Sequence, residues 1–480
     1  MLWPNKKRNL FQMSKATPPP ATPVEEIPKI VDDLRAYFNT GVTKPLSWRI
    51  TQLKGLIKLL DENGQAWVDA MNEDMGSHHF EGAILVANIR SEIEHTIKNL
   101  DTWLRPKKLP NPWALYPGST SVVPEPYGVV LDFIPYNYPM YLGFSTILPI
   151  LACGNVCLFK PSSKTPACAK LYHELFPKYL DPKGVIVICG PTRICDDILR
   201  QRFDFIFYTG SPNVGKVVQK AASQYLTPTL LELGGKSPVY VDESLSLTKC
   251  VRRLVWGKYF NGGQTCVCPD YCLVNEKIWD KFKEELLKVL QEFYGDITQY
   301  NDNITHIICK QHYDRIVQAI ETSGGQVIAN GFRDPERLYI GPTVVESPQM
   351  DSTLMTEEIF GPVLPIVKIS GAEEAIEFIN KREKPLALYV LSDNSNIIDL
   401  FTRATSSGAL MVNDTTFHVS SPYSPFGGVG NSGMGQYHGK YGIRSLSHSK
   451  PVVTHSTLID LDIRYPPYTD SHLSILKKFA

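Results

Sequence analysis

The sequence has no excess of either charge, because 49 Lys and Arg residues balance 49 Asp and Glu residues over 480 positions. No global field therefore draws the chain to nucleic acid or to an anionic membrane surface, and a small neutral partner fits at least as well. Uninterrupted apolar runs are also missing. The longest uncharged stretch, 133–159, contains three prolines, and backbone groups freed by prolines have no partner in lipid. The sequence thus predicts neither a nucleic-acid partner nor a membrane span.

The ten cysteines are scattered, with no Cys-x-x-Cys pair and no Cys/His cluster at zinc spacing. The adjacent pair His78-His79 has no third ligand within reach along the sequence, so we predict no metal site. Free thiols favour a reducing compartment. The first residues lack the apolar run of a secretory signal, whether translation starts at Met1 or Met13. We therefore expect a cytoplasmic protein whose last residues, too short to span a bilayer, could touch a membrane surface weakly.

The order of helices and strands predicts an α/β fold. Amphipathic helices begin near Glu25 and include one over 80–104, where apolar residues recur at helical spacing. From Val129 onward, short β-branched runs alternate with helical stretches, which is typical of a parallel sheet with crossover helices. A second series of alternating β-branched runs and helical stretches follows Gly235. The first series places its strands at 129–133, 156–159, 185–188 and 205–208, each followed by a loop where ligands of open α/β sheets bind.

Cys266 and Glu232 are the candidate reactive groups. Cys266 follows a glycine-containing turn, which can present its sulfur to a cleft with backbone N–H groups available to an oxyanion. Glu232 lies between Leu231 and Leu233, and apolar neighbours raise the pKa of a carboxyl group toward the range of a general base. Taken alone, each has a plainer interpretation, since an isolated cysteine is usually a buried apolar residue and such a glutamate often belongs to a structural ion pair.

Eight motifs occur in order along the chain: Glu125–Val130, Asn137–Pro139, Lys160–Ser162, Tyr208–Ser211 with Val214–Gly215, Glu232–Pro238, Gly263–Cys266, Glu357–Val363 and Pro425–Gly428. Together they resemble the aldehyde dehydrogenase superfamily over about 25–450. This resemblance favours the reactive over the structural interpretation of Cys266 and Glu232. Further details resemble its class 3, fatty-aldehyde branch. These are Leu364–Val367, Gly430–Gly435 with Tyr437–Lys440, and Arg464–Pro467.

The resemblance implies a Rossmann-like dinucleotide-binding domain, a second α/β catalytic domain and a small β oligomerisation arm that joins two subunits into a homodimer. The corresponding ranges are a flexible N-terminal arm at 1–24, the dinucleotide-binding domain at 25–102 and 125–233, the catalytic domain at 234–432, the oligomerisation arm at 103–124 and 433–455, and a C-terminal tail at 456–480.

The resemblance also implies roles for single residues. Cys266 would attack an aldehyde, its own N–H and the amide of Asn137 would hold the oxyanion, and Glu232 would activate the water that releases the acid. The coenzyme would be NAD or NADP. Lys160 and Glu358 would hold its ribose hydroxyls and Ser211 would face the pyrophosphate, with Gly210–Gly215 replacing the missing Gly-x-Gly-x-x-Gly. The full coenzyme set is Lys160, Ser163, Gly210, Ser211, Gly215, Leu233, Glu358 and Phe360.

Three positions depart from the family pattern. Tyr136 stands where many members have Trp, and we expect it to alter the aldehyde pocket. Ser163 stands where the family usually has a Glu, whose charge repels the 2′-phosphate of NADP. We therefore expect the enzyme to use both NAD and NADP. Lys160 and Lys164 would lie near the phosphate. Cys268 replaces a small residue without a thiol and adds an oxidation hazard.

An aromatic funnel is expected to favour medium or long aliphatic, or aromatic, aldehydes. His418 is expected to have a structural or pocket-lining role. Two alternatives stay open: an acylating enzyme that uses coenzyme A, against which the base Glu232 argues, and a non-enzymatic binding or structural relative, which would be expected to lose Cys266 or Glu232. The funnel residues are Phe133, Tyr136, Tyr138, Met140, Tyr141, Phe144 and Phe417.

Overall fold

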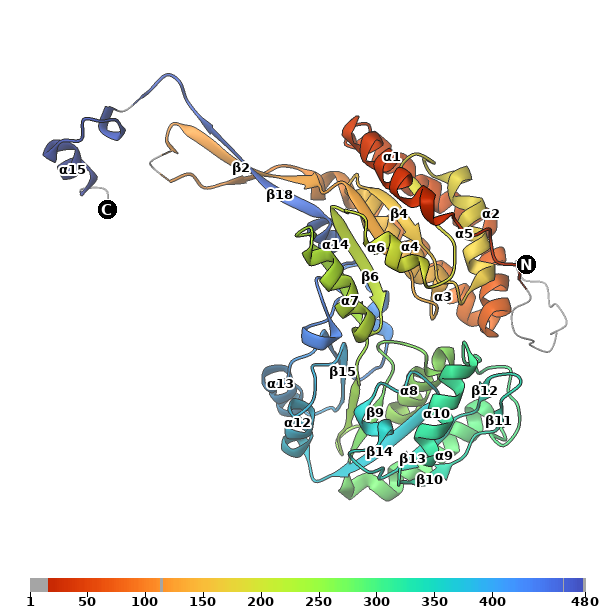
Figure 1. Cartoon of the computed structure of the whole chain (residues 1–480). Helices are drawn as coiled ribbons and strands as arrows, with labels where there is room; N and C mark the ends of the chain where they lie inside the picture. Colours follow the sequence, from red (N-terminus) through yellow and green to blue (C-terminus); the bar gives the residue numbers. More distant parts are fainter. Residues whose placement is uncertain (1–15, 113–114, 461, 478–480) are drawn as a thin grey trace.

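The computed structural model describes residues 16–112, 115–460 and 462–477. Two α/β bodies lie one above the other in Figure 1, and a long β arm projects sideways from the upper body, with the C-terminal residues at its far end. This mixed architecture confirms the predicted α/β class.

The first body is built on a six-stranded sheet in the order β17-β7-β6-β3-β4-β5, parallel except for β17. From β3 the chain adds β4 and β5 on one side and then returns to the other side for β6 and β7. The carboxyl ends of β3 and β6 therefore flank a topological switch point, where ligands of open α/β sheets bind. The strands are β3 (Val129–Phe133), β4 (Val156–Lys160), β5 (Val185–Val187), β6 (Phe205–Gly210), β7 (Thr229–Leu233) and β17 (Gly433–Met434).

Helices cover both faces of this sheet. The apolar faces of the long helices α2 and α3 bury residues such as Leu53, Leu56 and Ile93 completely. Where α2 meets α5, a Cβ at Gly55 would lie 2.2 Å from the carbonyl oxygen of Tyr179, so only glycine allows this approach. The helices are α1 (Ile27–Asn39), α2 (Leu46–Met75), α3 (His79–Leu104), α4 (Pro139–Ala152), α5 (Pro166–Tyr179), α6 (Ile194–Leu199) and α7 (Pro212–Ser223).

The second body contains a seven-stranded sheet in the order β10-β13-β14-β9-β8-β15-β16, parallel except for β10. Its inner strands are fully buried, as expected for a parallel sheet covered on both faces. The strands are β8 (Pro238–Val241), β9 (Tyr271–Asn275), β10 (Gln326–Ala329), β13 (Thr343–Glu346), β14 (Val363–Ile369), β15 (Ala387–Leu391) and β16 (Ala409–Val412). The helices are α8 (Leu247–Tyr259), α9 (Trp279–Tyr294), α10 (Lys310–Glu321), α11 (Thr353–Thr356), α12 (Ala372–Asn380) and α13 (Ser395–Ala404), beside the small hairpin β11 (Arg333–Asp334) and β12 (Tyr339–Ile340).

The projecting arm is an antiparallel sheet of β1 (Lys107–Leu109), β2 (Gly118–Pro126) and β18 (Ser447–His455). Strands β2 and β18 pair without interruption, from Ser447 opposite Pro126 to His455 opposite Gly118. Beyond β18 the described tail contains a 3-10 turn, η7 (Asp462–Arg464), and a short helix, α15 (Asp470–Leu476). Distant parts of the chain thus build one extended sheet whose β18 edge is open.

One detail of the predicted organisation needs correction. Gly433 and Met434, placed in the arm by the sequence, form β17 and pair with β7 of the first sheet, and α14 (Gly439–Ser445) packs on α3 and α4. The N-terminal segment 16–23 lacks helix and strand and is mostly exposed, as expected of a solvated arm, and the N–H of Thr22 donates to the carbonyl of Cys189 at 2.9 Å. The other predicted domain boundaries stay a prediction. In the described part of the chain, no helix combines the length and apolarity needed to cross a membrane.

Candidate active site

A left-handed turn presents Cys266. After α8, residues Asn261, Gly262 and Gly263 have φ values of 53°, 60° and 73°. A Cβ at Gly263 would lie 2.3 Å from the carbonyl oxygen of Gly361, so glycine lets this turn touch the segment that carries Glu358. The turn reverses the chain and leaves Cys266 partly exposed while its neighbours are buried.

Side-chain amides hold the turn in place. Gln264 donates from Nε2 to the carbonyl of His306 at 2.8 Å and accepts from the N–H of Ile308 at 3.1 Å. Asn137 donates from Nδ2 to the carbonyl of Gln264 at 3.1 Å, and its own carbonyl accepts from Asn261 Nδ2 at 2.9 Å. An amide nitrogen carries two N–H donors, so Asn137 retains one for a ligand beside Cys266.

Cys266 and Glu232 open into one cavity, as their proposed roles require. The cavity walls are mostly apolar and come from both bodies of the protein. They include Ile84, Leu85, Tyr138, Tyr141, Leu142, Trp256, Phe260, Val267, Phe417, Val419, Phe426 and Tyr437, with Asn88, Thr209, Thr265, Thr416, Ser420 and His438 as polar members.

Glu232 faces this cavity without a polar partner. It lies near the end of β7 and is 3% exposed, and neither carboxyl oxygen accepts a hydrogen bond from any described residue. Burial raises its pKa well above the usual value, because the charged form loses its hydration. A buried carboxyl group without a partner costs stability, which is consistent with a group reserved for a transient ligand.

The thiol of Cys266 is also poorly ionised. Burial raises its pKa, and the nearby carboxylates of Glu358 and Glu232 raise it further, because negative charge disfavours a thiolate. A cysteine attacks as its thiolate, so Cys266 as a nucleophile would need a proton acceptor next to it. Glu232, in the same cavity, has the right chemistry once it is deprotonated.

The coenzyme residues predicted in the first body gather at the carboxyl ends of β4, β6 and β7. The buried ammonium of Lys160 donates to the carbonyl of Pro161 at 2.8 Å, which leaves two of its three N–H donors. Burial lowers its pKa. Ser211 follows Gly210 and caps α7, accepting from the N–H of Val214 at 3.4 Å. A Cβ at Gly215 would lie 2.7 Å from Leu233 Cδ2, so α7 packs directly on the end of β7.

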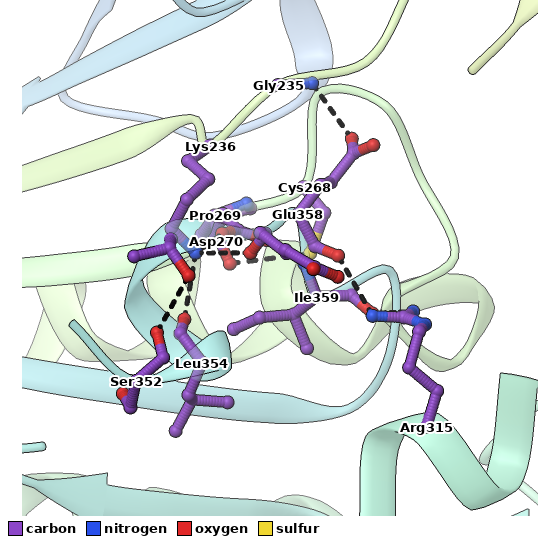
Figure 2. A network of polar contacts seen from close by, with 12 residues as sticks. Gly235, Lys236, Cys268, Pro269, Asp270, Arg315, Ser352, Leu354, Glu358 and Ile359 are labelled. Atoms are coloured by element: carbon purple, nitrogen blue, oxygen red, sulfur yellow. Dashed lines mark hydrogen bonds and ion pairs between the residues drawn. The ribbon is translucent and has the colours of Figure 1, made fainter. Parts of the chain in front are cut away.

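Glu358 lies in the second body, in the network of polar contacts shown in Figure 2, and Phe360 follows two residues later. The N–H of Gly235 donates to Glu358 Oε1 at 3.0 Å. Arg315 donates to the carbonyls of Glu358 and Ile359 at 3.1 and 2.6 Å. Burial first, and then repulsion from Asp270, raise the pKa of Glu358 to about 8.

An ion pair that sequence reasoning missed anchors this network. Lys236 pairs with Asp270, and the two side chains are 11% and 3% exposed. Lys236 also donates to the carbonyls of Leu354 and Glu357 at 2.9 and 2.8 Å, while Asp270 accepts from the N–H of Ile359 at 2.9 Å. The pair thereby ties the motif Glu232–Pro238 to the motif Glu357–Val363 through Asp270, which follows the Cys266 motif along the chain (Figure 2). Lys236 stood inside a quoted motif, but sequence gives no sign of its partner.

The predicted aromatic funnel is partly wrong. Tyr138, Tyr141 and Phe417 line the cavity, whereas Met140 and Phe144 are buried in the core. Phe133 is also buried, packed edge-on near the ring of Tyr208. Trp256, Phe260, Phe426 and Tyr437 were missed, because they come from distant segments that only the fold brings together.

Tyr136 does not shape the aldehyde cavity, contrary to expectation. Its hydroxyl lies 3.1 Å from His312 Nδ1 and its ring is 6.0 Å from that of Phe360, so it faces the coenzyme side. Lys164 is 3.3 Å from His312 Nε2 and its ammonium lies over the Tyr136 ring. Lys164 is thus engaged in this cluster, and its predicted pairing with a coenzyme phosphate finds no support in the geometry.

The histidines fill structural positions. His418 packs against the rings of Tyr389 and Phe426, and neither ring nitrogen has a hydrogen-bond partner among the described residues. Burial lowers its pKa to about 4, so it is neutral at physiological pH and does not line the cavity. His78 caps α3 by accepting from the N–H of Phe80. Across the described ranges, no group of three or more His, Cys, Asp or Glu side chains could hold a metal ion.

The same motifs match a known family across most of the chain. Residues 9–452 match the profile of the aldehyde dehydrogenase family. The chain belongs to that family. This aldehyde dehydrogenase is 40% identical to aldehyde dehydrogenase family 3 comG of Dictyostelium discoideum, over 92% of this chain and 94% of the relative. It is 39% identical to family 3 member B1 of Homo sapiens, over 92% and 95% of the two chains. It is 38% identical to 4,4'-diaponeurosporen-aldehyde dehydrogenase of Staphylococcus aureus, over 91% and 95%.

Solved structures agree with the fold. The aldehyde dehydrogenase resembles substrate-bound AldH of Staphylococcus aureus with a TM-score of 0.91 and 37% identity, over 95% of this chain and 99% of that chain. It also resembles glyceraldehyde-3-phosphate dehydrogenase GapN of Methanocaldococcus jannaschii complexed with NADP, with a TM-score of 0.82 and 25% identity, over 94% and 100%. The chain is therefore an enzyme that oxidises aldehydes with a nicotinamide dinucleotide, and the predicted similarity to class 3 is confirmed.

Proposed function

We propose that the oxidation proceeds through a covalent adduct on Cys266 and that Glu232 serves as the base. The observation that carries this proposal is the shared cavity, in which the thiol of Cys266 and the unpartnered carboxyl group of Glu232 both open. A structural cysteine would be fully enclosed, and a structural glutamate would have donors around it.

In the first half-reaction, Cys266 Sγ bonds to the carbonyl carbon and the thiol proton passes to the carboxylate of Glu232. The oxyanion accepts hydrogen bonds from the N–H of Cys266 and the remaining N–H of Asn137, whose orientation Gln264 fixes. Re-formation of the C=O bond requires a hydride acceptor, and a nicotinamide dinucleotide held by Lys160, Ser211 and Glu358 would supply that chemistry. A thioester on Cys266 is left.

In the second half-reaction, Glu232 first loses its proton to solvent and then takes one from a water molecule. The water oxygen attacks the thioester carbon, the C–S bond breaks, the acid leaves, and Cys266 regains a proton. The apolar wall around Glu232 keeps its pKa raised, and a base works best when its pKa is near the operating pH.

The residues at the switch point fit a dinucleotide. Lys160 has free N–H donors for ribose hydroxyls, and the first N–H groups of α7 after Ser211 attract a pyrophosphate. Glu358, on the opposite side, offers a carboxylate oxygen to the second ribose. Leu233, Gly215 and Phe360 provide apolar contact surface. These assignments agree with the coenzyme set predicted from the sequence.

We assign the substrates to apolar aldehydes, aliphatic of medium or long chain or aromatic, because the cavity walls are mostly apolar. The test is absorbance of the reduced nicotinamide, with a series of aldehydes of increasing chain length and no coenzyme A. We expect kcat/KM to rise with chain length. Turnover only on addition of coenzyme A would instead indicate the acylating reaction, and no turnover under either condition would indicate a non-enzymatic relative.

We also propose that the enzyme accepts both NAD and NADP. Ser163 carries no charge to repel a 2′-phosphate, and its Oγ lies 3.4 Å from Thr192 Oγ1 in a cluster of hydroxyl groups. We expect kcat/KM for the two coenzymes within about a hundredfold, or about 2.7 kcal/mol. Ser163→Glu should depress NADP use far more than NAD use. An unchanged ratio in that variant would show that Ser163 does not face the 2′ position.

The assembly that we propose is a homodimer. In the order β1-β2-β18, strand β18 has one unpaired edge and exposes Val452 and Val453 by 39% and 51%. Open apolar edges invite pairing with another strand, and a second copy would cover this one. Light scattering should give twice the chain mass of 53.9 kDa; a single chain mass at micromolar concentration would contradict the dimer.

A further inference from the structure

The N-terminal segment Pro18–Thr22, called the proline strap below, is fixed to the coenzyme body at one point. The N–H of Thr22 donates to the carbonyl of Cys189 at 2.9 Å, and Thr22 Oγ1 accepts from the N–H of Cys189 at 3.3 Å. Cys189 lies two residues beyond the end of β5 (Val185–Val187). Both backbone groups of Cys189 are therefore used to hold the strap at the carboxyl edge of the first sheet.

A cavity lies between the strap and that edge. Three strap residues form one side, and the opposite side comes from the loops after β4 and β5 and from the start of α5. The lining residues are Pro18, Pro19 and Ala21 on the strap, and Pro161, Ser162, Ser163, Pro166, Ala169, Cys189, Gly190 and Pro191 on the body. The strap thus encloses a space rather than filling it.

The chemistry of this cavity is that of an adenosine site. Its walls are largely proline and alanine, which offer flat apolar contact and no charge. Its polar members include Ser162 and Ser163, and Ser163 lies beside the hydroxyl of Thr192. Lys160, which we propose to hold the ribose, precedes this group on β4. A flat heterocycle that carries a sugar with hydroxyl groups matches this combination.

The loop after β5 lies within contact distance of the strap. Gly190 has a φ of 150°, which residues with a side chain rarely adopt, and a Cβ there would lie 3.7 Å from Ala21 Cβ, an ordinary van der Waals distance. The loop therefore passes directly beside the strap. The three prolines of the strap, Pro18, Pro19 and Pro20, restrict its backbone, so little conformational entropy is lost when it forms a wall.

We propose that the proline strap forms one wall of the adenosine end of the coenzyme site, so that strap docking and coenzyme binding stabilise each other. This inference rests on the coenzyme site proposed above. Within the described residues, the strap does not reach the cavity of Cys266 and Glu232. Its loss should weaken coenzyme binding and leave the chemical step unchanged.

The test compares two truncated chains with the full chain. Removal of residues 1–22 takes away both the strap and its anchor, whereas removal of residues 1–15 leaves them and serves as the matched control. Binding of NAD, NADP and AMP is measured by calorimetry, and kcat is measured at saturating coenzyme. AMP probes the adenosine end alone. Thermal unfolding of each chain shows whether the body remains folded.

We expect removal of 1–22 to weaken NAD and AMP binding about tenfold while kcat changes less than about twofold, an activation difference below ~0.5 kcal/mol. The chain lacking 1–15 should match the full chain. Thr22→Val, which removes the hydroxyl acceptor for Cys189, should weaken AMP binding by a smaller factor. Such a graded loss of affinity would support a strap that forms a wall of the adenosine site, rather than a general loss of stability.

Three results would overturn the proposal. Equal affinities in the full chain and the chain lacking 1–22 would show that the strap does not contact the coenzyme. Tighter AMP binding after removal would make the strap a plug instead of a wall. Failure of the full chain to bind NAD or NADP at all would overturn the coenzyme site itself, and the strap proposal with it, which separates the two kinds of failure.

Discussion

Two glutamates whose charges act on Cys266, the buried Glu232 and the partly exposed Glu358, have opposite surroundings. Glu232, from the first body, has no hydrogen-bond donor among the described residues for either carboxyl oxygen. Glu358, from the second body, accepts from the N–H of Gly235, and Arg315 and the Lys236–Asp270 pair hold its backbone segment. Burial raises the pKa of both, yet only Glu358 has nearby cations and a donor that oppose the shift.

On the proposed roles, the difference separates a group that reacts from a group that binds. A carboxylate fixed by donors has a defined position, which suits a hydrogen bond to a ribose. A carboxyl group without donors is free to exchange protons with substrate or water, at the cost of an unsatisfied buried polar group. The four predictions below test this contrast, from the largest expected effect on turnover to the smallest.

Replacing Cys266, the proposed nucleophile, should have the largest effect on turnover. Cys266→Ser should lower kcat by about a thousandfold or more, an activation cost of about 4 kcal/mol, because a neutral hydroxyl is a far weaker nucleophile. Coenzyme binding should stay nearly unchanged, since Glu358 and Lys160 are intact. Steady-state assay with calorimetry provides both values, and retention of more than about a tenth of kcat, a cost below ~1.4 kcal/mol, contradicts the assignment.

Removing the charge of Glu232, the unpartnered glutamate, should have the second largest effect. Glu232→Gln should slow acid release by about a hundredfold, or ~2.7 kcal/mol, more than it slows formation of the acyl-enzyme, because an amide cannot accept a proton from water. Mass spectrometry should show more acyl adduct on Cys266. Because burial raises the pKa of Glu232 and the carboxylate is the base, release by the wild type should accelerate as pH rises. The variant should lose this dependence; equal steady-state rates would point to another base.

Breaking the Lys236–Asp270 ion pair should test the second half of the comparison, the fixed position of Glu358. Lys236→Met leaves Asp270 buried without its cation, which should lower the free energy of unfolding by about 3–5 kcal/mol and raise the coenzyme KM about tenfold. In the matched control Lys381→Met, the lost pair with Glu377 is exposed, and the change should stay below about 1 kcal/mol. Denaturant unfolding and coenzyme titration measure both. An unchanged KM would remove the pair from coenzyme positioning.

Glu81 has surroundings intermediate between those of Glu232 and Glu358, and replacing it should have the smallest effect of the four changes. It accepts from the N–H of Asn261 at 3.4 Å and from Thr305 Oγ1 at 3.2 Å, and burial raises its pKa to about 7. The folded state then holds a proton that the unfolded chain releases near its ordinary pKa of 4.5. Stability should therefore fall as pH rises from 4.5 through 7.

The Glu81→Gln variant should lose this part of the pH dependence. Relative to wild type, it should gain about 1–2 kcal/mol between pH 4.5 and pH 8, less than the full shift because Glu81 is partly exposed. Chemical unfolding at several pH values measures the difference. Parallel curves for the two proteins would show that Glu81 does not titrate in this range.

Much of the fold and of the site was predictable because its determinants are local. The strands 129–133 and 156–159 follow from β-branched runs, and the structure places β3 and β4 there. Cys266 and Glu232 stood out by residue type, glycine context and motif order. Their roles and that of Asn137 stay predictions, but their geometry agrees with them.

The remaining features depended on distant pairings that the sequence does not encode locally. Asp270 gives no sign that it meets Lys236, and Tyr136 was assigned to the wrong side because its direction depends on His312, far along the chain. The sequence by itself determined the α/β class, the candidate reactive residues and the family. Only the tertiary structure decided which carboxyl group stays unpartnered and which side chains line the cavity, since burial and hydrogen bonding are properties of surroundings assembled from remote segments.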